Sequence, residues 1–136
     1  MHDRKGVPFS ILLLDIDHFK QVNDRYGHQV GDLVLKSLAK SMSGVTRSFD
    51  TIGRWGKEEF LGIFPNTEKE ELRIVAEKTH TVARHTQIPN NKLRFSVTIG
   101  DAVVRSSEDK TSLIQRADEA LYQGKETGRD KWIISE

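Results

Sequence analysis

A short apolar run at residues 9–17, with the sequence FSILLLDID, leaves few choices for the architecture of the chain. Its length and its partly β-branched content predict a central strand buried on both faces, since a surface strand alternates with polar residues. The run ends in Asp15 and Asp17. We therefore expect two carboxylates at the end of a buried strand, beside a turn and away from any solvated helix face.

Apolar residues at helical spacing predict three amphipathic helices in the rest of the chain. One is expected over residues 31–44, and another opens with a capping box formed by Thr67 and Glu70. The third is expected over residues 109–125. The polar stretch 23–32, before the first of these helices, is interpreted as a loop that leads into it.

Alternating apolar residues and turn signals predict the remaining strands. Gly56 and Lys57 alone separate two of them, which is typical of a hairpin with a two-residue turn. Gly100 and Asp101 are expected to break or bend a third. The strands expected are 51–55, 58–64, 93–99, 102–104 and 132–134. This order predicts an α/β fold, a central and mostly antiparallel sheet flanked by helices, with the hairpin at its centre.

The composition narrows the functional classes. The chain has 136 residues, enough for one domain, and no apolar run approaches the roughly 20 residues that cross a bilayer. Its 21 basic and 20 acidic residues give a net charge of +1, which argues against a protein held to nucleic acid by a basic surface. The absence of cysteine excludes disulfides, thiolate zinc sites and thiol nucleophiles, and is compatible with the cytoplasm.

Four acidic residues lie where strands are expected to end. Asp15 and Asp17 close the apolar strand, and Glu58 and Glu59 follow the tight turn. If the hairpin lies beside the first strand, one acid of each pair can meet, and such carboxylates suit a hard cation such as Mg²⁺. The other interpretation is that all four are solvated turn residues.

Two further polar segments permit both a structural and a functional interpretation. Lys125 and Arg129 flank Gly128 near the end of the last helix, where they could stabilise the helix dipole or neutralise triphosphate oxygens. The stretch 23–32 could serve as a turn and helix cap. It could also recognise guanine, because a carboxylate accepts hydrogen bonds from the two adjacent N–H donors of that base.

Together these segments resemble the GGDEF domain of diguanylate cyclases, in register over nearly the whole chain. The segments that carry the resemblance are Asp15-Ile-Asp-His-Phe-Lys-Gln-Val-Asn-Asp24, Tyr26-Gly-His28, Gly31-Asp32, Arg54-Trp-Gly-Lys-Glu-Glu-Phe60, Ala117-Asp118 and Tyr122-Gln-Gly-Lys-Glu-Thr-Gly-Arg129. These enzymes condense two GTP molecules into cyclic di-GMP and two pyrophosphates. The resemblance implies the fold of nucleotidyl cyclases and polymerase palms, with a ferredoxin-like core.

The resemblance also implies roles for individual residues. Asp15, Glu58 and the Ile16 carbonyl would hold Mg²⁺, or Mn²⁺ in its place. Glu59 would add a ligand or help deprotonate the 3′-hydroxyl. The residues implied in substrate binding are Asn23, Asp32 and Leu35 for guanine, and His18, Phe19, Gly56, Lys125 and Arg129 for the phosphates. Phosphoryl transfer mainly requires positioning and charge neutralisation, which these residue types supply.

Regulation and partners are implied in the same way. One such domain holds one GTP, so catalysis needs a head-to-tail homodimer, directed by a sensor or receiver domain in a longer parent chain. Arg47 and Asp50 match the inhibitory RxxD site for cyclic di-GMP, with Lys78 as a second contact. The expected location is cytoplasmic, although a membrane could anchor the parent protein.

The chain departs from the family at two points. Lysine replaces the second glycine of the signature, which reads Gly56-Lys57-Glu58-Glu59-Phe60. A type II′ turn accepts Lys57, whereas a type I′ turn would cost roughly 1–2 kcal/mol, and the side chain could block or bind phosphate. The family's N-terminal helix, with its D-x-L-T-G-L-x-N-R signature, is absent, so we expect residues 1–136 to be a trimmed single domain of a longer protein.

Two alternatives to an active cyclase stay open. Lys57 motivates a catalytically inactive domain that binds GTP or cyclic di-GMP within a signalling protein. Another nucleotidyl transferase with the same sheet is the second alternative, although Asp32 favours guanine over adenine. The turnover of GTP against ATP, and the effect of Lys57→Gly, distinguish these functions.

Overall fold

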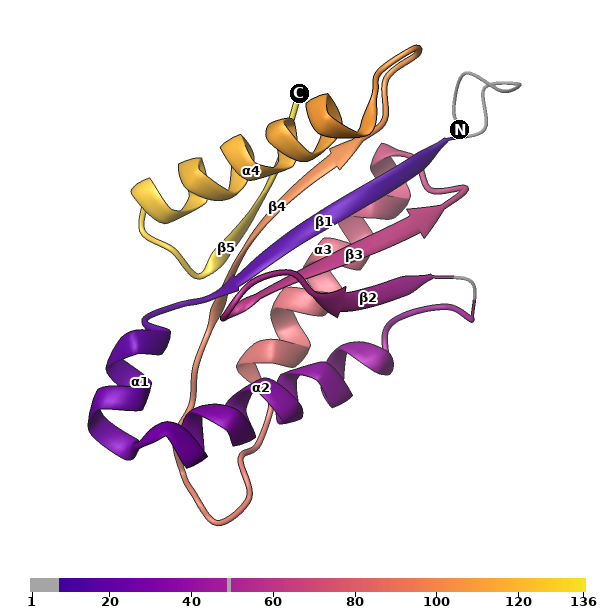
Figure 1. The fold of residues 1–136 in the computed structure, drawn as a ribbon. Helices are drawn as coiled ribbons and strands as arrows, with labels where there is room; N and C mark the ends of the chain where they lie inside the picture. Colours follow the sequence, from indigo (N-terminus) through magenta and orange to yellow (C-terminus); the bar gives the residue numbers. More distant parts are fainter. Residues whose placement is uncertain (1–7, 49) are drawn as a thin grey trace.

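The computed structural model describes residues 8–48 and 50–136, which form a five-stranded sheet covered by helices (Figure 1). The strands are β1 (Phe9–Ile16), β2 (Thr51–Arg54), β3 (Glu59–Pro65), β4 (Val97–Val103) and β5 (Lys131–Ile134). The helices are α1 (Phe19–Tyr26), α2 (His28–Ser43), α3 (Lys69–Arg84) and α4 (Lys110–Glu126).

β1 is the central strand of the sheet, as its apolar sequence predicts. The order is β2-β3-β1-β4-β5, and β1 is antiparallel to both β3 and β4. β2 pairs antiparallel with β3, whereas β5 runs parallel to β4. The expected mostly antiparallel sheet flanked by helices is confirmed, but the hairpin of β2 and β3 lies on one side of the sheet, with β2 at the edge.

Alternation along β1 divides the core between the two faces of the sheet. Leu12 and Leu14 join a buried cluster with residues of α1, α2 and α3, whereas Ile11 and Leu13 join a second cluster with residues of α4. Burying one such side chain contributes roughly 1.5–3 kcal/mol, so both clusters hold helices on the sheet. By the same alternation, Asp15 lies on the face that α4 covers.

The polar stretch 23–32 is helical, so the expected loop is wrong. α1 and α2 meet within it, separated only by Gly27, whose φ of 93° is a conformation that glycine adopts without strain. Phe19 and Val22 are the buried residues of α1, spaced as on one face of a helix. Polar residues on the exposed faces of two helices produce the same sequence pattern as a polar loop.

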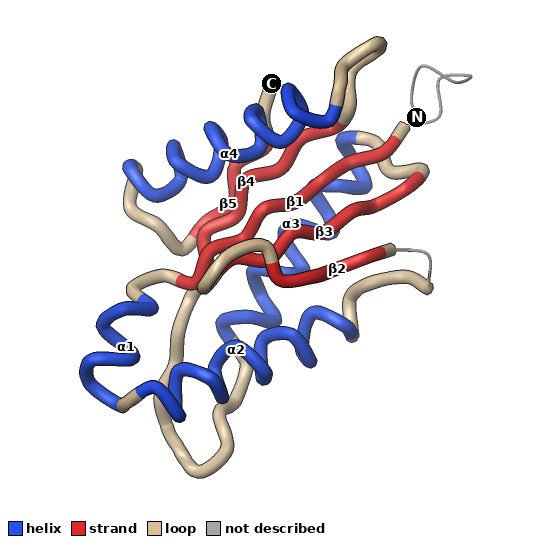
Figure 2. Tube along the Cα trace, in the orientation of Figure 1, coloured by secondary structure: helices blue, strands red, loops and turns tan. Residues whose placement is uncertain are grey.

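β4 is one uninterrupted strand, so the expected break at Gly100 and Asp101 is also wrong. Both residues lie inside the strand and are buried. A Cβ atom at Gly100 would lie 2.2 Å from the Ala117 carbonyl oxygen and 2.3 Å from the Leu121 nitrogen, so glycine is needed there because α4 crosses closely. Residues 93–96, expected in this strand, precede it in the long connection from α3 (Figure 2).

α3 begins one residue later than expected. Its capping box consists of Glu68 and Glu71, and Glu68 N donates to Glu71 Oε1 at 3.1 Å. Thr67 does not cap the helix, because its hydroxyl donates to the Pro65 carbonyl at 3.0 Å. Thr67 and Glu70 have the same three-residue spacing as Glu68 and Glu71, so the sequence alone does not show which pair forms the capping box.

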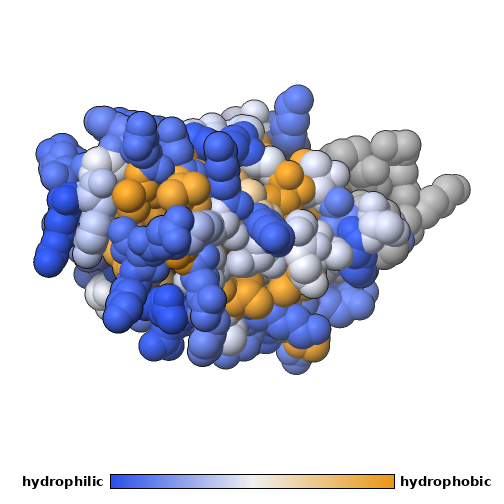
Figure 3. Space-filling model, turned by 90° about the horizontal axis from the view of Figure 1, so that it is seen from below, coloured by the Kyte–Doolittle hydropathy of each residue, from blue (hydrophilic) through white to orange (hydrophobic). Residues whose placement is uncertain are grey.

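The length and surface character of the described helices bear on whether any of them could cross a membrane. Among the helices of residues 8–48 and 50–136, none combines the length and the apolar character that crossing a membrane requires. The face of the molecule seen in Figure 3 is mainly hydrophilic, with apolar residues in separate patches. Most of the large buried side chains belong to the two clusters on either side of the sheet.

An ion pair between Glu108 and Arg116 fastens the start of α4 to β4. Arg116 Nη2 donates to Glu108 Oε1 at 2.7 Å and Arg116 Nε donates to Oε2 at 2.8 Å, while Nη2 also donates to the Val103 carbonyl. The two side chains are only 12% and 6% exposed, for Arg116 and Glu108. The hydrogen bonds from Arg116 lower the pKa of Glu108 to about 2.

Glu108→Gln is expected to lower the free energy of unfolding by about 2 kcal/mol at about pH 7, because the amide leaves the buried Arg116 without its counter-charge. A carboxyl whose folded pKa is lowered stabilises the fold above its unfolded value, so this contribution is lost as the pH falls from 4.5 towards about 2. Denaturant unfolding should therefore show a smaller difference at about pH 3 than at about pH 7. Equal differences at both pH values would contradict the expectation, and Glu119→Gln, at an exposed position of α4, is the control.

Candidate active site

A cavity of about 370 Å³ opens at the end of β1, where the strand meets α1, the hairpin loop and the end of α4. Its lining residues are Asp15, Ile16, His18, Phe19, Lys20, Gln21, Asp24, Glu58, Lys125 and Arg129. Most of these are residues that the resemblance implies in metal or phosphate binding. The fold thus brings the candidate acids and the candidate cations to one place.

Carboxylates meet beside this cavity because the hairpin lies along β1. Asp15 and Glu59 are opposite one another in the register of β1 and β3, and Ile16 N donates to the Glu58 carbonyl at 3.2 Å. Burial, followed by the negative charge of Asp15, raises the pKa of both Glu58 and Glu59, while Lys125 counteracts part of this effect. Asp15 therefore meets both glutamates of the hairpin.

Lys125, in the last turn of α4, forms an ion pair with Asp15. The Asp15 side chain is 7% exposed and that of Lys125 is 26% exposed, so the pair is largely shielded from water. Because Asp15 lies on the face of the sheet that α4 covers, the end of this helix brings the ammonium group to the acids. The Thr127 carbonyl at the helix end instead accepts a hydrogen bond from Lys131 Nζ.

The way in which α4 ends places Arg129 at the cavity. Gly128, with a φ of 119°, follows the helix, and Arg129 N donates to the Gly124 carbonyl at 2.9 Å. This is a Schellman-type termination, in which glycine takes the left-handed conformation just past the helix. The Gly-Arg pair thus ends the helix and places the arginine beside the acids.

Asp17 does not join the acid cluster. It is buried, and its carboxylate accepts hydrogen bonds from Ser96 Oγ and Thr98 Oγ1, both at 2.6 Å, and from Asp130 N at 3.0 Å. These bonds tie the end of β1 to β4 and to the segment that carries Arg129. Asp17 is therefore a positioning residue. The sequence signal that could have indicated this role is the pair of hydroxyl residues Ser96 and Thr98, which lie at alternate positions.

The residues implied in guanine recognition do not line this cavity. They lie on α1 and α2, and α1 is also a wall of the cavity. The side chain of Asn23 packs against Gly31, where a Cβ atom would lie 1.9 Å from Asn23 Oδ1. Asp32 is exposed near the start of α2, and Leu35 is buried on the same helix.

The hairpin loop is longer than expected and spans residues 55–58, between β2 and β3. Neither Gly56 nor Lys57 has a positive φ, so the turn is neither type I′ nor type II′, and the strain considered for Lys57 does not arise. A Cβ atom at position 56 would lie 2.9 Å from Glu59 Oε1, so a larger residue there would displace the end of the Glu59 side chain. Lys57 is exposed and does not line the cavity.

The donor groups suit a hard divalent cation that shares its coordination shell with a substrate. Carboxylates and backbone carbonyls are oxygen ligands, and Mg²⁺ usually completes its shell with water and substrate phosphates. Within the described part of the chain, no three acidic, histidine or cysteine side chains are arranged to enclose an ion by themselves. The raised pKa values of Glu58 and Glu59 reflect burial together with negative charge, which a bound cation would offset.

The residues of the implied inhibitory site lie together on another surface. Arg47 Nη2 donates to Asp50 Oδ1 at 2.9 Å and to Thr67 Oγ1 at 2.6 Å, and Arg47 N donates to Asp50 Oδ2 at 2.7 Å. Arg47 and Lys78 line a cavity of about 540 Å³ between the end of α2 and α3. This cavity shares no residue with the one at the end of β1.

Known proteins of similar sequence point to one family. Residues 1–131 match the family model described as diguanylate cyclase, GGDEF domain. Diguanylate cyclase A of Treponema denticola is 38% identical over 134 residues, which cover 96% of this chain and 36% of that protein. Diguanylate cyclase DgcM of Escherichia coli is 38% identical over 127 residues, which cover 93% of this chain and 31% of that protein. The chain thus spans about a third of the length of these curated relatives.

Solved structures agree in fold. The active GGEEF domain of a diguanylate cyclase from Vibrio cholerae superposes with a TM-score of 0.93 at 31% identity, covering 99% of this chain and 87% of that one. The GGDEF domain of DgcB from Caulobacter crescentus, solved in complex with c-di-GMP, superposes with a TM-score of 0.92 at 29% identity. The match covers 98% of this chain and 81% of that one. The expected palm-like fold is confirmed, and the chain belongs to the GGDEF-domain family of diguanylate cyclases.

Proposed function

We propose that the chain binds GTP with Mg²⁺ and, as a dimer, condenses two GTP molecules into cyclic di-GMP. The observation that carries the proposal is the single cavity lined by Asp15, Glu58, Lys125 and Arg129. Phosphoryl transfer depends on in-line positioning and on neutralising charge, and acids that hold a cation beside two basic side chains supply both.

Metal and triphosphate would bind side by side in this cavity. Asp15, Glu58 and the Ile16 carbonyl would hold Mg²⁺, or Mn²⁺ in its place, which supplies charge neutralisation for the phosphates. Arg129 binds phosphate oxygens in a bidentate manner, and Lys125 acts as a point charge. The ion pair with Asp15 holds Lys125 at the site before a nucleotide arrives.

Backbone groups complete the phosphate site. His18 has a φ of 57°, which turns the chain from β1 into α1, and both His18 and Phe19 line the cavity. The amides at this helix start can donate to phosphate oxygens, and the helix dipole favours an anion there. In the hairpin loop, the missing side chain of Gly56 leaves the backbone accessible to the nucleotide.

Glu59 is the proposed acceptor of the proton from the 3′-hydroxyl, or a further metal ligand. Its pKa is raised by burial and by the charge of Asp15, which brings it closer to the range in which a carboxylate acts as a general base. Protonation of Glu58 and Glu59 would also remove metal ligands. Turnover is therefore expected to fall as the pH is lowered through the raised pKa values of these two residues.

Guanine recognition is assigned to the pair of helices α1 and α2. Asp32 is exposed, so its carboxylate can accept from the two adjacent N–H donors of guanine, and Asn23 lies on the neighbouring helix. Leu35 supplies apolar surface against the base. Adenine lacks this pair of donors, so GTP is preferred to ATP.

Catalysis is proposed to require two copies of the chain that face one another. One cavity holds one GTP, and each 3′-hydroxyl must reach the α-phosphate of the other nucleotide. The curated relatives are much longer than this chain, which supports a parent protein with a sensor or receiver domain that controls the pairing.

An assay of the chain fused to a dimerising leucine zipper tests the proposal. With Mg²⁺ and GTP we expect cyclic di-GMP and pyrophosphate, no turnover after chelation of the metal, and little turnover of ATP. Absence of product despite forced dimerisation would contradict an enzyme. GTP binding in the same sample, measured by calorimetry, would then indicate an inactive nucleotide-binding domain.

Lys57→Gly is expected to change kcat and KM by less than about threefold, as surface substitutions usually do. Lys57 is exposed, has an ordinary backbone conformation and does not line the active-site cavity. Steady-state kinetics of the dimerised chain measure the effect, and Lys57→Ala separates the side chain from backbone flexibility. A gain of tenfold or more in both variants would mean that the lysine obstructs the nucleotide.

Arg47→Ala is expected to weaken inhibition by cyclic di-GMP roughly tenfold or more, since a hydrogen bond from a charged group contributes about 1.5–3 kcal/mol. Turnover without added product should stay unchanged, because Arg47 lies outside the active-site cavity. Arg73→Ala, at an exposed position of α3, is the matched control. Unaltered inhibition in a folded Arg47→Ala protein would contradict the inhibitory site.

A further inference from the structure

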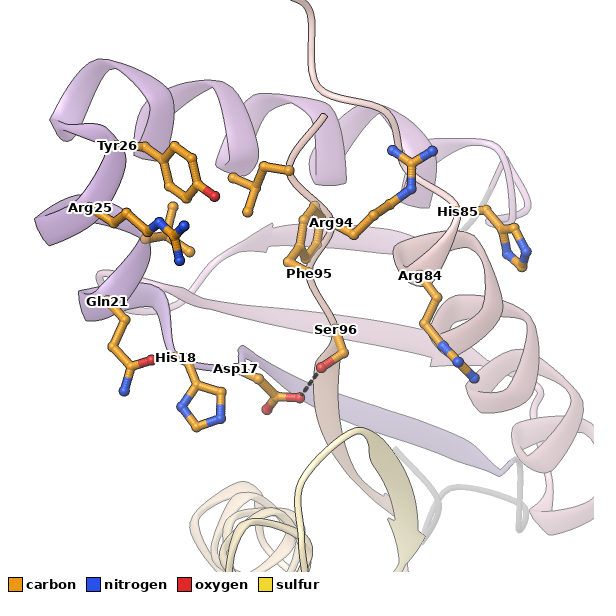
Figure 4. A pocket seen from close by; sticks show the side chains of 12 residues that line it. Asp17, His18, Gln21, Arg25, Tyr26, Arg84, His85, Arg94, Phe95 and Ser96 are labelled. Atoms are coloured by element: carbon orange, nitrogen blue, oxygen red, sulfur yellow. Dashed lines mark hydrogen bonds between the residues drawn. The ribbon is translucent and has the colours of Figure 1, made fainter. Parts of the chain in front are cut away.

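A second cavity, of about 750 Å³, lies between α1, the end of α3 and the extended segment 93–96 (Figure 4). Its lining residues are Asp17, His18, Gln21, Val22, Arg25, Tyr26, Arg84, His85, Leu93, Arg94, Phe95 and Ser96. Only His18 and Gln21 also line the active-site cavity, so the two cavities lie against different parts of α1. Nothing in the proposed cyclase reaction uses the second one.

Positive charge dominates this cavity. Arg25 comes from α1, Arg84 from the end of α3 and Arg94 from the extended segment, so each wall contributes one arginine. Asp17 is the one carboxylate among the lining residues. Its two oxygens already accept hydrogen bonds from the Ser96 and Thr98 hydroxyls and from the Asp130 amide. The three arginines therefore have no acidic partner within the cavity.

These arginines differ from most others in residues 8–48 and 50–136. The arginines whose guanidinium group makes a hydrogen bond or an ion pair are Arg47, Arg54, Arg73, Arg105 and Arg116. Arg84 and Arg94 make none, and Arg25 only lies 5.5 Å above the Tyr26 ring. Within the same residues, Arg129 is the remaining arginine without such a bond, and it lines the proposed phosphate site. The arginines without such a partner in the described residues thus line two cavities.

We propose that the second cavity binds a phosphorylated small molecule with a planar ring. Arginine recognises phosphate oxygens through paired N–H donors, and an anionic ligand would supply the counter-charge that these side chains lack within the described residues. The volume lies within the roughly 300–1,000 Å³ of small-molecule sites. Tyr26, which Figure 4 shows extending from α1 toward the segment of Arg94 and Phe95, supplies an aromatic surface for the ring.

Titration of the ¹⁵N-labelled chain followed by NMR tests this site, with sodium tripolyphosphate and ATP as the probes. Saturable shifts are expected at the amides of residues 84–85 and 93–96, which line the second cavity but not the active-site cavity. Equal affinities for the two probes would support recognition of phosphate alone, and tighter binding of ATP would support a contribution from the ring. Shifts confined to the residues of the active-site cavity would overturn the proposal.

Paired substitutions separate this site from the active-site cavity. Arg84→Gln combined with Arg94→Gln is expected to raise the dissociation constant measured at His85, Phe95 and Ser96 roughly tenfold or more, since each substitution removes charged donors to phosphate. Both side chains are exposed and make no hydrogen bond or ion pair with residues 8–48 or 50–136, so the fold should be retained. Arg73→Gln, on the same helix as Arg84, should leave the constant unchanged. Equal binding by the double variant and the parent chain would overturn the proposal.

Discussion

Replacing Asp15 with asparagine is expected to lower the rate of cyclic di-GMP formation about a thousandfold or more. Asp15 is the carboxylate that both Glu58 and Glu59 approach and with which Lys125 forms an ion pair. Asparagine keeps the shape of the side chain but removes its negative charge. The proposed Mg²⁺ would then lose a ligand, and Lys125 would lose the carboxylate with which it forms an ion pair. Measuring kcat/KM over a Mg²⁺ titration of the dimerised chain checks both effects.

Asp24→Asn is the matched control for this experiment. Asp24 lines the same cavity, but its side chain is 66% exposed and lies 3.4 Å from Lys20. Exposed ion pairs contribute little, so kcat/KM should change by less than about threefold. Similar losses in both variants would show that the overall charge of the cavity matters, not the ligand at position 15. Full activity of Asp15→Asn would contradict the proposed metal site.

The sheet was predictable because its central strand has a strong local signal. Residues 11–14 are four consecutive apolar residues, and such a run fits a strand that is covered on both faces. Residues 23–32 have no comparable signal. Their polar side chains occupy exposed faces of α1 and α2, and only the tertiary burial of Phe19 and Val22 distinguishes a helix from a loop there.

Gly100 illustrates a second limit of local patterns. In the sequence it follows alternating apolar residues and suggests a break, whereas in the structure it lies inside β4. The reason is the passage of α4 over the strand, since a Cβ atom would collide with backbone atoms of that helix. A glycine that makes room for a neighbouring element cannot be distinguished, from its local sequence, from one that turns the chain.

The part of the candidate site that depends only on the pairing of neighbouring strands could be predicted from the sequence. Asp15 and the Glu58–Glu59 pair follow directly from the hairpin lying beside β1. The partner of Lys125 was not predictable, because it depends on which face of the sheet α4 covers. The sequence predicts only that one acid of each pair joins the cluster, since two acids at alternate positions, such as Asp15 and Asp17, look equivalent in a sequence. The hydrogen bonds that tie Asp17 to β4 separate it from the cluster.

A buried acid that serves neither the site nor an ion pair remains in the core. Asp101 lies in β4, is completely buried, and neither of its carboxylate oxygens has a hydrogen-bond partner within the described residues. It is opposite Leu12 in the register with β1, and alternation places it on the same face as Val97 and Ile99. Burial raises the pKa of Asp101 well above its usual range. A polar group in such a position costs free energy that an apolar side chain would not.

Asp101→Val is therefore expected to raise the free energy of unfolding by about 3 kcal/mol at about pH 7. Valine has a similar size, and its β-branched side chain suits a buried strand. A carboxyl whose folded pKa is raised costs stability only above its unfolded pKa of 3.8, so the advantage of valine should widen as the pH rises from there. Denaturant unfolding at about pH 4 and about pH 7 measures this change.

Asp101→Asn serves as the control, because it retains a buried polar group of the same shape but cannot titrate. Its stability should lie below that of Asp101→Val by an amount that does not depend on pH, which separates the cost of burying a polar group from the cost of the charge. If Asp101→Val were less stable than the parent chain at about pH 7, the carboxyl would have a stabilising partner and the expectation would be wrong. Because Asp101 does not line the active-site cavity, kcat/KM of the valine variant should equal that of the parent chain.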